Sequence, residues 1–239
     1  MKKTTLTFIV AAVFLLISAN KAFAKPKYYS QYQYYYGLAK NALKGNAKDL
    51  SILKKNAKEE NSFAQAELGF YYYSKSNGQK ALFWTKKSVR QGNYAAENNL
   101  GAFYFKGLFG LNQNYTKGLY WLKKSAMQGY DYAEYALGFA YFHGKGVPVK
   151  YNHARYWFEK AAQKGFKLAD VDLALIYAKG LGVPINYKKA FYYSKKSGIY
   201  KMCYYSAITY IMMKYFITES AAKPKAAYKC RGLKNNGKY

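Results

Sequence analysis

The strongest constraint on the fold is a pair of landmarks that recurs along the chain at a nearly constant spacing. A Leu-Gly pair, weakened once to Leu-Ala, is followed each time by one large aromatic residue. Successive copies lie 32 or 36–37 residues apart, a period typical of helical repeats. One such unit cannot bury its own apolar face, so the repeats must stack. The pairs are Leu68-Gly69, Leu100-Gly101, Leu137-Gly138 and Leu173-Ala174, and the aromatic residues are Trp84, Trp121, Trp157 and Tyr193.

Each repeat is predicted to form two helices, here called helix A and helix B, joined by a turn. Between Tyr132 and Gly165, apolar residues recur every three or four positions in both halves, which is the spacing of one helix face rather than of a strand. Gly138 is small where the two helices must approach closely. The apolar positions are Ala133, Ala136, Leu137, Ala140 and Tyr141 in helix A, and Ala154, Trp157, Phe158, Ala161 and Ala162 in helix B.

The turn between the two helices explains the two period lengths. The unit with helices predicted at 64–73 and 79–90 has only Ser76-Asn77-Gly78 between them, whereas the next three units carry four or five more residues there. In those longer turns the first glycine, such as Gly107, can take the left-handed conformation that ends helix A.

These motifs resemble a known repeat family. The pattern Ala-x-x-Leu-Gly-x-x-Tyr-x-x-Gly-x-Gly-Val, followed by Lys-Ala-x-x-Trp-x-x-Lys-Ala-Ala-x-x-Gly, is similar to the Sel-1-like repeat, a relative of the tetratricopeptide repeat. Residues 138–173 match it almost fully, 101–137 and 174–197 match well, 69–100 match without the glycine insertion, and 37–68 match loosely. The resemblance implies an all-α fold, an α-solenoid of about five helix-turn-helix repeats with a C-terminal capping helix.

The domain boundaries follow from the repeats and from the composition of the two ends. We expect the following segments: 1–24 signal peptide, 25–36 Tyr-rich lead-in, 37–200 repeats, 201–217 capping helix and 218–239 basic C-terminal tail.

The N-terminus has the features of a secretory signal. Lys2-Lys3 precedes an apolar run from Leu6 to Ile17 that is too short to span a bilayer comfortably, and Ala22-Phe23-Ala24 fits a cleavage site. An uncleaved N-terminal anchor helix is the alternative. We expect the protein to be exported by the signal peptide and to be periplasmic or secreted.

The chain is strongly basic, with a formal net charge of +28. Cleavage after Ala24 removes three lysines and no acid, so the mature chain would carry +25. Such an excess favours acidic proteins, anionic polymers or lipid head groups as partners, and export makes nucleic acid a less suitable target.

The C-terminal region carries the only two cysteines, Cys203 and Cys230. The apolar stretch from Met202 to Ile217 is short for a transmembrane helix and is interpreted as a buried helix that closes the repeats. In an oxidising compartment an even cysteine count favours a disulfide, which would hold the tail over the end of the repeats. Two free thiols are the alternative.

No pattern indicates catalysis, a metal or a cofactor, and we expect none. His143 and His153 lack the acids or cysteines that would complete a metal set, and the Gly-x-Gly turns follow helices rather than strands. Three acids recur in the first turn of helix A, where negative charge complements the helix dipole. These are Glu97, Glu134 and Asp170. The helix B lysines also recur, either as a solvated face or as a basic stripe for an anionic partner. They are Lys86-Lys87, Lys123-Lys124, Lys160 and Lys195-Lys196.

Aromatic residues of helix A are the candidate binding site. In related helical solenoids helix A lines the concave surface, and the resemblance implies that residues one and four positions after the glycine point there. Aromatic rows offer large contact area with few rotors, which suits peptide recognition. The candidates are Tyr34, Phe70, Tyr73, Phe105, Tyr135, Phe139 and Phe142. Packing between repeats is the alternative interpretation, and it would make Phe105→Ala and Phe142→Ala strongly destabilising.

The resemblance therefore implies an exported protein–protein interaction module, either a scaffold in the cell envelope or a factor contacting a host protein. A binder of anionic envelope polymer or lipid head groups is the first alternative. The second is a β-lactam-recognising hydrolase, because the family includes cysteine-rich secreted members described as binding or hydrolysing β-lactams. Those members carry a Cys pair in each repeat, whereas this chain has two cysteines in all.

Overall fold

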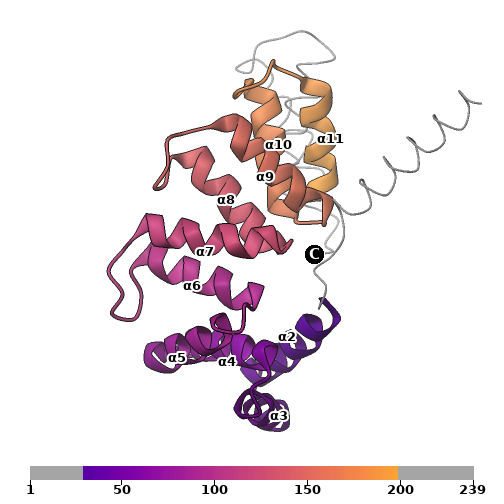
Figure 1. The fold of residues 1–239 in the computed structure, drawn as a ribbon. Coiled ribbons are helices and arrows are strands. Elements are labelled where there is room, and N and C mark those ends of the chain that lie inside the picture. Colours follow the sequence, from indigo (N-terminus) through magenta and orange to yellow (C-terminus); the bar gives the residue numbers. More distant parts are fainter. Residues whose placement is uncertain (1–28, 199–239) are drawn as a thin grey trace, which may run out of the picture. The chain divides into compact units, whose positions relative to one another are not determined.

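The computed structural model describes residues 29–198, and within that range it contains ten α-helices and no strand. The helices follow one another as five hairpins (Figure 1). In chain order they are α2 (Tyr29–Leu43), α3 (Ala47–Lys58), α4 (Ser62–Ser74), α5 (Gly78–Val89), α6 (Tyr94–Lys106), α7 (Tyr115–Met127), α8 (Asp131–His143), α9 (Tyr151–Gln163), α10 (Lys167–Lys179) and α11 (Tyr187–Ser197). The all-α class predicted from the repeats is confirmed.

The N-terminal hairpin begins earlier than the repeat pattern alone indicates. Helix α2 runs without a break from Tyr29 through Gly37 to Leu43, so much of the Tyr-rich lead-in and the start of the degenerate repeat share one helix. Tyr32 and Tyr35 are already buried there.

Asparagine caps set where most of the helices begin. The side-chain oxygen of Asn93, for example, accepts hydrogen bonds from the backbone N–H groups of Ala95 and Ala96, which have no carbonyl partner inside the helix. Six helices start with the same device, at Asn46, Asn61, Asn77, Asn93, Asn114 and Asn186. A shared cap residue helps to fix where helices begin in four of the five hairpins, and the hairpin of α8 and α9 is the exception.

Glycine ends helix A where the turn is long, as predicted. Gly107 after α6 and Gly180 after α10 have φ of 63° and 67°, the left-handed region that favours glycine. The short turn between α4 and α5 uses Ser76 instead, with φ of 57°. The three long turns and the two short turns, 44–46 and 75–77, account for the two repeat lengths.

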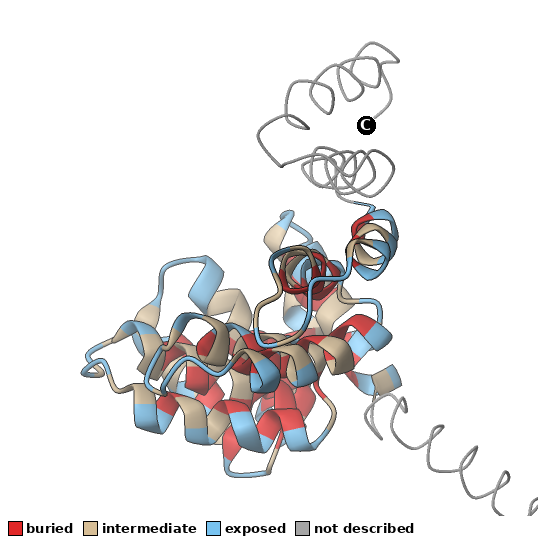
Figure 2. Cartoon of the chain, turned by 90° about the horizontal axis from the view of Figure 1, so that it is seen from above, coloured by how far each residue is buried: buried red, intermediate tan, exposed pale blue. Residues whose placement is uncertain are grey.

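The described residues belong to two compact units that divide after Glu134, inside α8. In each unit buried residues gather on the helix faces that meet (Figure 2). In the second unit the centre is Phe158 on α9, which is fully buried and packs against Gly138. A Cβ built on Gly138 would lie 2.5 Å from Cδ1 of Phe158, which confirms the predicted close approach of helices A and B.

Several predicted segments lie outside the described residues. These are the signal peptide 1–24, the capping helix 201–217, the basic tail 218–239, and Cys203 and Cys230. Between residues 29 and 198, no helix combines the length and the apolar character needed to cross a membrane.

Candidate functional site

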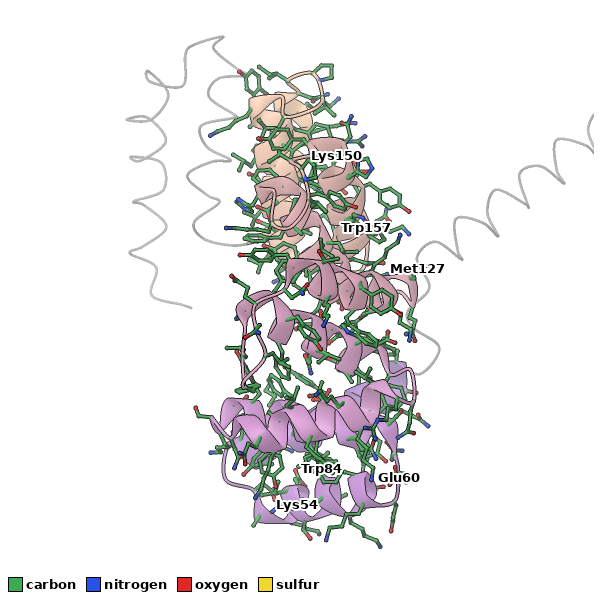
Figure 3. The ribbon with its side chains drawn as sticks, turned by 60° about the vertical axis from the view of Figure 1, so that its left-hand side comes forward. Lys54, Glu60, Trp84, Met127, Lys150 and Trp157 are labelled. Atoms are coloured by element: carbon green, nitrogen blue, oxygen red, sulfur yellow. The ribbon has the colours of Figure 1, made fainter. Side chains whose placement is uncertain are left out.

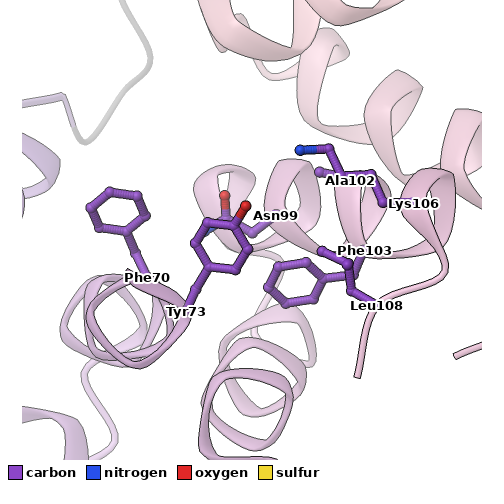
Figure 4. A pocket seen from close by; sticks show the side chains of 7 residues that line it. All are labelled: Phe70, Tyr73, Asn99, Ala102, Phe103, Lys106 and Leu108. Carbon is purple, nitrogen blue, oxygen red and sulfur yellow. The ribbon is translucent and has the colours of Figure 1, made fainter. Parts of the chain in front are cut away.

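A pocket on the helix A face of the first unit is the best candidate for a binding site (Figure 4). It has a volume of about 110 Å³ and lies between α4 and α6. Its walls are mostly aromatic and apolar, with one amide and one ammonium group. The lining residues are Phe70, Tyr73, Asn99, Ala102, Phe103, Lys106 and Leu108.

The aromatic wall of the pocket is held in place by ring contacts. The ring of Tyr73 stacks on Phe103 with centroids 5.8 Å apart, and it meets the edge of Phe109 at 6.0 Å. Phe103 is buried, whereas Tyr73 is 37% exposed. A buried residue therefore fixes an exposed ring, so little rotational freedom would be lost on binding a partner.

Two polar side chains on α6, Asn99 and Lys106, would orient a ligand in the pocket. Asn99 and Lys106 are seven residues apart and so share one helix face with Ala102. Asn99 accepts a hydrogen bond from the amide of Asn98 at 3.4 Å, which leaves its own amide N–H groups available. The exposed Lys106 forms no ion pair within the described part of the chain. The pocket can therefore hold an apolar side chain while Asn99 donates to a carbonyl and Lys106 attracts an acidic group.

Two of the predicted groove residues, Phe70 and Tyr73, line this pocket, but Phe105 does not. Phe105 packs on Tyr115 with centroids 5.3 Å apart, and its ring lies over Gly118. The difference comes from the first residue of helix B, which is Tyr115 under Phe105. The preceding repeat has Gly78 at the equivalent position, so Tyr73 has no such ring beneath it.

The second unit repeats this arrangement. Phe142 packs on Tyr151 and on the buried Phe158, with centroids 5.4 and 6.1 Å apart. Tyr135 packs on Phe158 and Phe166 at 5.6 and 4.8 Å. These contacts support packing roles for Phe142 and Tyr135.

Two further predicted residues are exposed. Phe139 is 41% exposed and lies against His143, and Tyr34 is 56% exposed and meets the edge of Tyr35. Neither residue lines the pocket between α4 and α6, so their predicted role in binding stays a prediction.

Ala102 holds the predicted position directly after Gly101, but sequence reasoning missed four lining residues: Asn99, Phe103, Lys106 and Leu108. The helical spacing of Asn99, Ala102 and Lys106 was a usable signal, because it puts all three on one face. Leu108 comes from the turn after α6, and nothing in the sequence pattern indicated that this turn folds back over the helix.

The recurrent acids of helix A are buried, and lysines of helix B reach them. Glu97 is fully buried, forms an ion pair with Lys124 at 3.1 Å and accepts a hydrogen bond from Gln128 at 2.7 Å. Asp170 pairs with Lys196 at 3.0 Å. Burial raises the pKa of both carboxyl groups, and the lysines oppose that rise. These acids therefore hold helix A to helix B, and Lys124 and Lys196 are not part of a free basic stripe.

Another buried carboxyl group, Glu67 on α4, lies within a cluster of tyrosines. The surrounding tyrosines include Tyr32, Tyr94 and Tyr130, and the hydroxyls of Tyr32 and Tyr130 are 3.1 Å apart. Burial raises the pKa of Glu67 to about 8, and its Oε2 atom has no hydrogen-bond partner in the described structure. At neutral pH this carboxyl group holds its proton.

The histidines and acids of the described residues form no metal-binding cluster. Between residues 29 and 198, no group of three His, Cys, Asp or Glu side chains could hold a metal ion. His143 lies against Phe139 and Phe142, and His153 against Tyr141.

The model of one protein family, the Sel1 repeat, matches the chain four times, and the matched segments cover more than half of its length. They are residues 62–93, 95–130, 131–166 and 168–198, which correspond to the four hairpins from α4 to α11. No curated protein sequence matches the chain.

Solved structures of the same repeat resemble the chain in fold. A Sel1 repeat protein from Oxalobacter formigenes is 22% identical with a TM-score of 0.66, and the match covers 94% of this chain and 99% of that one. The protein c5321, a protective antigen of uropathogenic Escherichia coli with an SLR fold, is 23% identical with a TM-score of 0.67 over 93% of this chain and 48% of its own. A Sel1 repeat protein from Klebsiella pneumoniae is 19% identical with a TM-score of 0.53, over 77% and 99% of the two chains.

Proposed function

Because this chain belongs to the Sel1 repeat family, whose members generally act as protein–protein interaction scaffolds, we propose that it is an exported scaffold that binds a partner peptide in the pocket between α4 and α6. The single observation that carries the proposal is that pocket. Rings held by a buried neighbour provide apolar area, and Asn99 and Lys106 provide hydrogen bonding and positive charge beside it.

The chemistry of the pocket defines the partner segment. An aromatic or aliphatic side chain would fill the space between Phe70, Tyr73 and Phe103. An acidic residue next to it would reach Lys106, in agreement with the strongly basic chain. The partner is therefore a protein with an exposed segment that joins one large apolar side chain to a nearby carboxylate. It would belong to the cell envelope or to a host cell.

Site-specific photo-crosslinking tests the pocket. A photoreactive residue at Lys106 should crosslink one envelope or extracellular protein, and the same residue at Lys58, which is exposed on α3, should not. Ala102→Trp should abolish the crosslink from position 106 by filling the pocket. Equal crosslinking from both positions, or a crosslink unaffected by Ala102→Trp, would exclude the pocket as the binding site.

Export has its own test. Mass spectrometry of the chain from fractionated cells should find a mature N-terminus at Lys25 outside the cytoplasm. An intact N-terminus retained in the cytoplasmic fraction would overturn export and leave the peptide pocket standing.

A further inference from the structure

A second surface, on helix B, carries exposed aromatic rings that the packing does not use. Phe83 on α5 is 58% exposed and Tyr120 on α7 is 60% exposed, and both helices lie in the first unit. The two rings occupy the same place in consecutive repeats, immediately before Trp84 and Trp121.

The following residue holds each exposed ring in one orientation. Phe83 meets Trp84 edge to face with centroids 5.1 Å apart, and Tyr120 meets Trp121 in the same way at 5.0 Å. Figure 3 labels Trp84 on the ribbon. A ring fixed in this way offers a large apolar face to a ligand at little cost in conformational freedom.

Three residues after each of these rings, on the same side of the helix, lies a lysine that forms no ion pair within residues 29–198. These lysines are Lys86 and Lys123, which are both exposed. The lysine next to each does form an ion pair, Lys87 with Glu60 and Lys124 with Glu97. We call the four residues Phe83, Lys86, Tyr120 and Lys123 the aromatic–lysine surface.

The hairpin of α2 and α3 shows that the fold does not need these rings. The position in α3 that corresponds to Phe83, 32 residues earlier, is Ser51, which is exposed. Helix α3 nevertheless forms and packs against α2 and α4. An exposed ring at this position therefore adds nothing that the hairpin requires.

From this combination we propose that the aromatic–lysine surface binds an acidic polysaccharide. Sugar rings present a flat C–H face that can lie on an aromatic ring, and a carboxylate on the sugar can accept a charged hydrogen bond from the neighbouring lysine. A polymer with a repeating acidic unit matches a binding unit that itself recurs along the chain. The net charge of +28 draws such a polymer to the surface.

Two other polyanions fit this surface less well. An anionic membrane would require a continuous apolar face, whereas each of these rings stands singly among lysines. Single-stranded nucleic acid could also stack on the rings. The choice of a polysaccharide over nucleic acid rests on the proposed export. Binding to an anionic membrane and to single-stranded nucleic acid is therefore measured as well.

Binding to polygalacturonate, a linear acidic polysaccharide, tests the proposal with the purified chain. Phe83→Ser with Tyr120→Ser copies the natural Ser51 and removes the rings but keeps the charge. Lys86→Gln with Lys123→Gln removes charge but keeps the rings. Each pair should weaken binding by about tenfold or more. The fully methyl-esterified polymer should bind about tenfold or more weakly, because its carboxylates are neutral.

The control removes the same amount of charge from α3, where Ser51 stands at the position of the ring. Lys54→Gln with Lys58→Gln alters two exposed lysines of α3 and should change affinity by less than about threefold. If this pair weakens binding as much as Lys86 and Lys123 do, or if removing the rings has no effect, the attraction is unspecific and the proposal is wrong.

The remaining arms separate the alternatives. Tighter binding to oligo(dT) or to phosphatidylglycerol vesicles than to polygalacturonate would overturn the assignment of the ligand. Ala102→Trp, which fills the peptide pocket, should bind polygalacturonate like the unmodified chain. Failure of the peptide pocket and failure of this surface are therefore distinguishable.

Discussion

Gly138 on α8 lies directly against the ring of Phe158 on α9, and a Cβ at position 138 would come within 2.5 Å of the Cδ1 atom. Phe158 is fully buried, so its ring has little room to move away. This contact sets how closely helices A and B of that hairpin approach.

Gly138→Ala should therefore destabilise the chain. Overpacking a buried site costs about 1–3 kcal/mol, and the better helix propensity of Ala returns at most about 1 kcal/mol. The matched control is Gly37→Ala in α2, where nothing lies within 4 Å of the new Cβ and where stability should stay level or rise. The melting temperatures of the two variants test this prediction. A melting temperature of Gly138→Ala as high as that of Gly37→Ala would show that the two helices can move apart at no cost in stability.

Phe142 and Phe139 should respond differently to the same substitution. Phe142 packs on the core around Phe158, so Phe142→Ala should cost about 2–4 kcal/mol. Phe139 is 41% exposed, and Phe139→Ala should cost less than about 1 kcal/mol. Chemical denaturation measures both values. A loss of stability as small as that of Phe139→Ala would show that Phe142 is not a packing residue and would support its predicted role in the groove.

The sequence predicted the fold more completely than the site. The Leu-Gly and Trp landmarks located the helices of the repeats from 62 onward because both are needed wherever helix A meets helix B, as at Gly138 and Phe158. The groove residues depended instead on what lies beside each ring. Tyr73 and Phe105 hold equivalent positions, yet only Phe105 has a tyrosine beneath it, because α7 begins with Tyr115 where α5 begins with Gly78. Such contacts depend on residues outside the Leu-Gly and Trp landmarks, which the repeat pattern does not fix.

Lys124→Met should be more destabilising than its neighbour Lys123→Met. Methionine keeps the packing of the aliphatic stem on Trp121, over which the ammonium of Lys124 lies at 5.3 Å. It removes the cation from Glu97, a fully buried carboxylate. Because Lys124 is itself partly exposed, we expect a loss of about 1–3 kcal/mol, less than for a fully buried pair. Lys123 forms no ion pair within residues 29–198, and its replacement should change stability by less than about 0.5 kcal/mol. Equal stability of the two variants would contradict a structural role for the Glu97–Lys124 pair.

Glu67 should make stability fall as pH rises. Its pKa is about 8 in the folded chain, whereas an exposed glutamate titrates near about 4.3. The folded state thus binds more protons between these two values, and stability should decline through that window by up to about 1.4 kcal/mol per pH unit. The tyrosines facing it from α2, α6 and the start of α8 titrate at higher pH.

Glu67→Gln cannot ionise and should lose this part of the pH dependence. Denaturation of the variant and of the unmodified chain at pH 5 and pH 8 measures it, with Glu59→Gln as an exposed control. If stability changes with pH in the same way for Glu67→Gln and the unmodified chain, the raised pKa of Glu67 is ruled out.

Burial of acids has a consequence for how copies of this protein meet one another. Four of the ten acidic residues between 29 and 198 are buried, namely Glu67, Glu97, Glu134 and Asp170. The acidic side chains left on the surface of this part are few beside the lysines, so two approaching copies repel each other. This repulsion keeps the molecules dispersed without any dedicated surface feature. At physiological salt it acts over only about 8 Å, so the dispersing effect weakens as ionic strength rises.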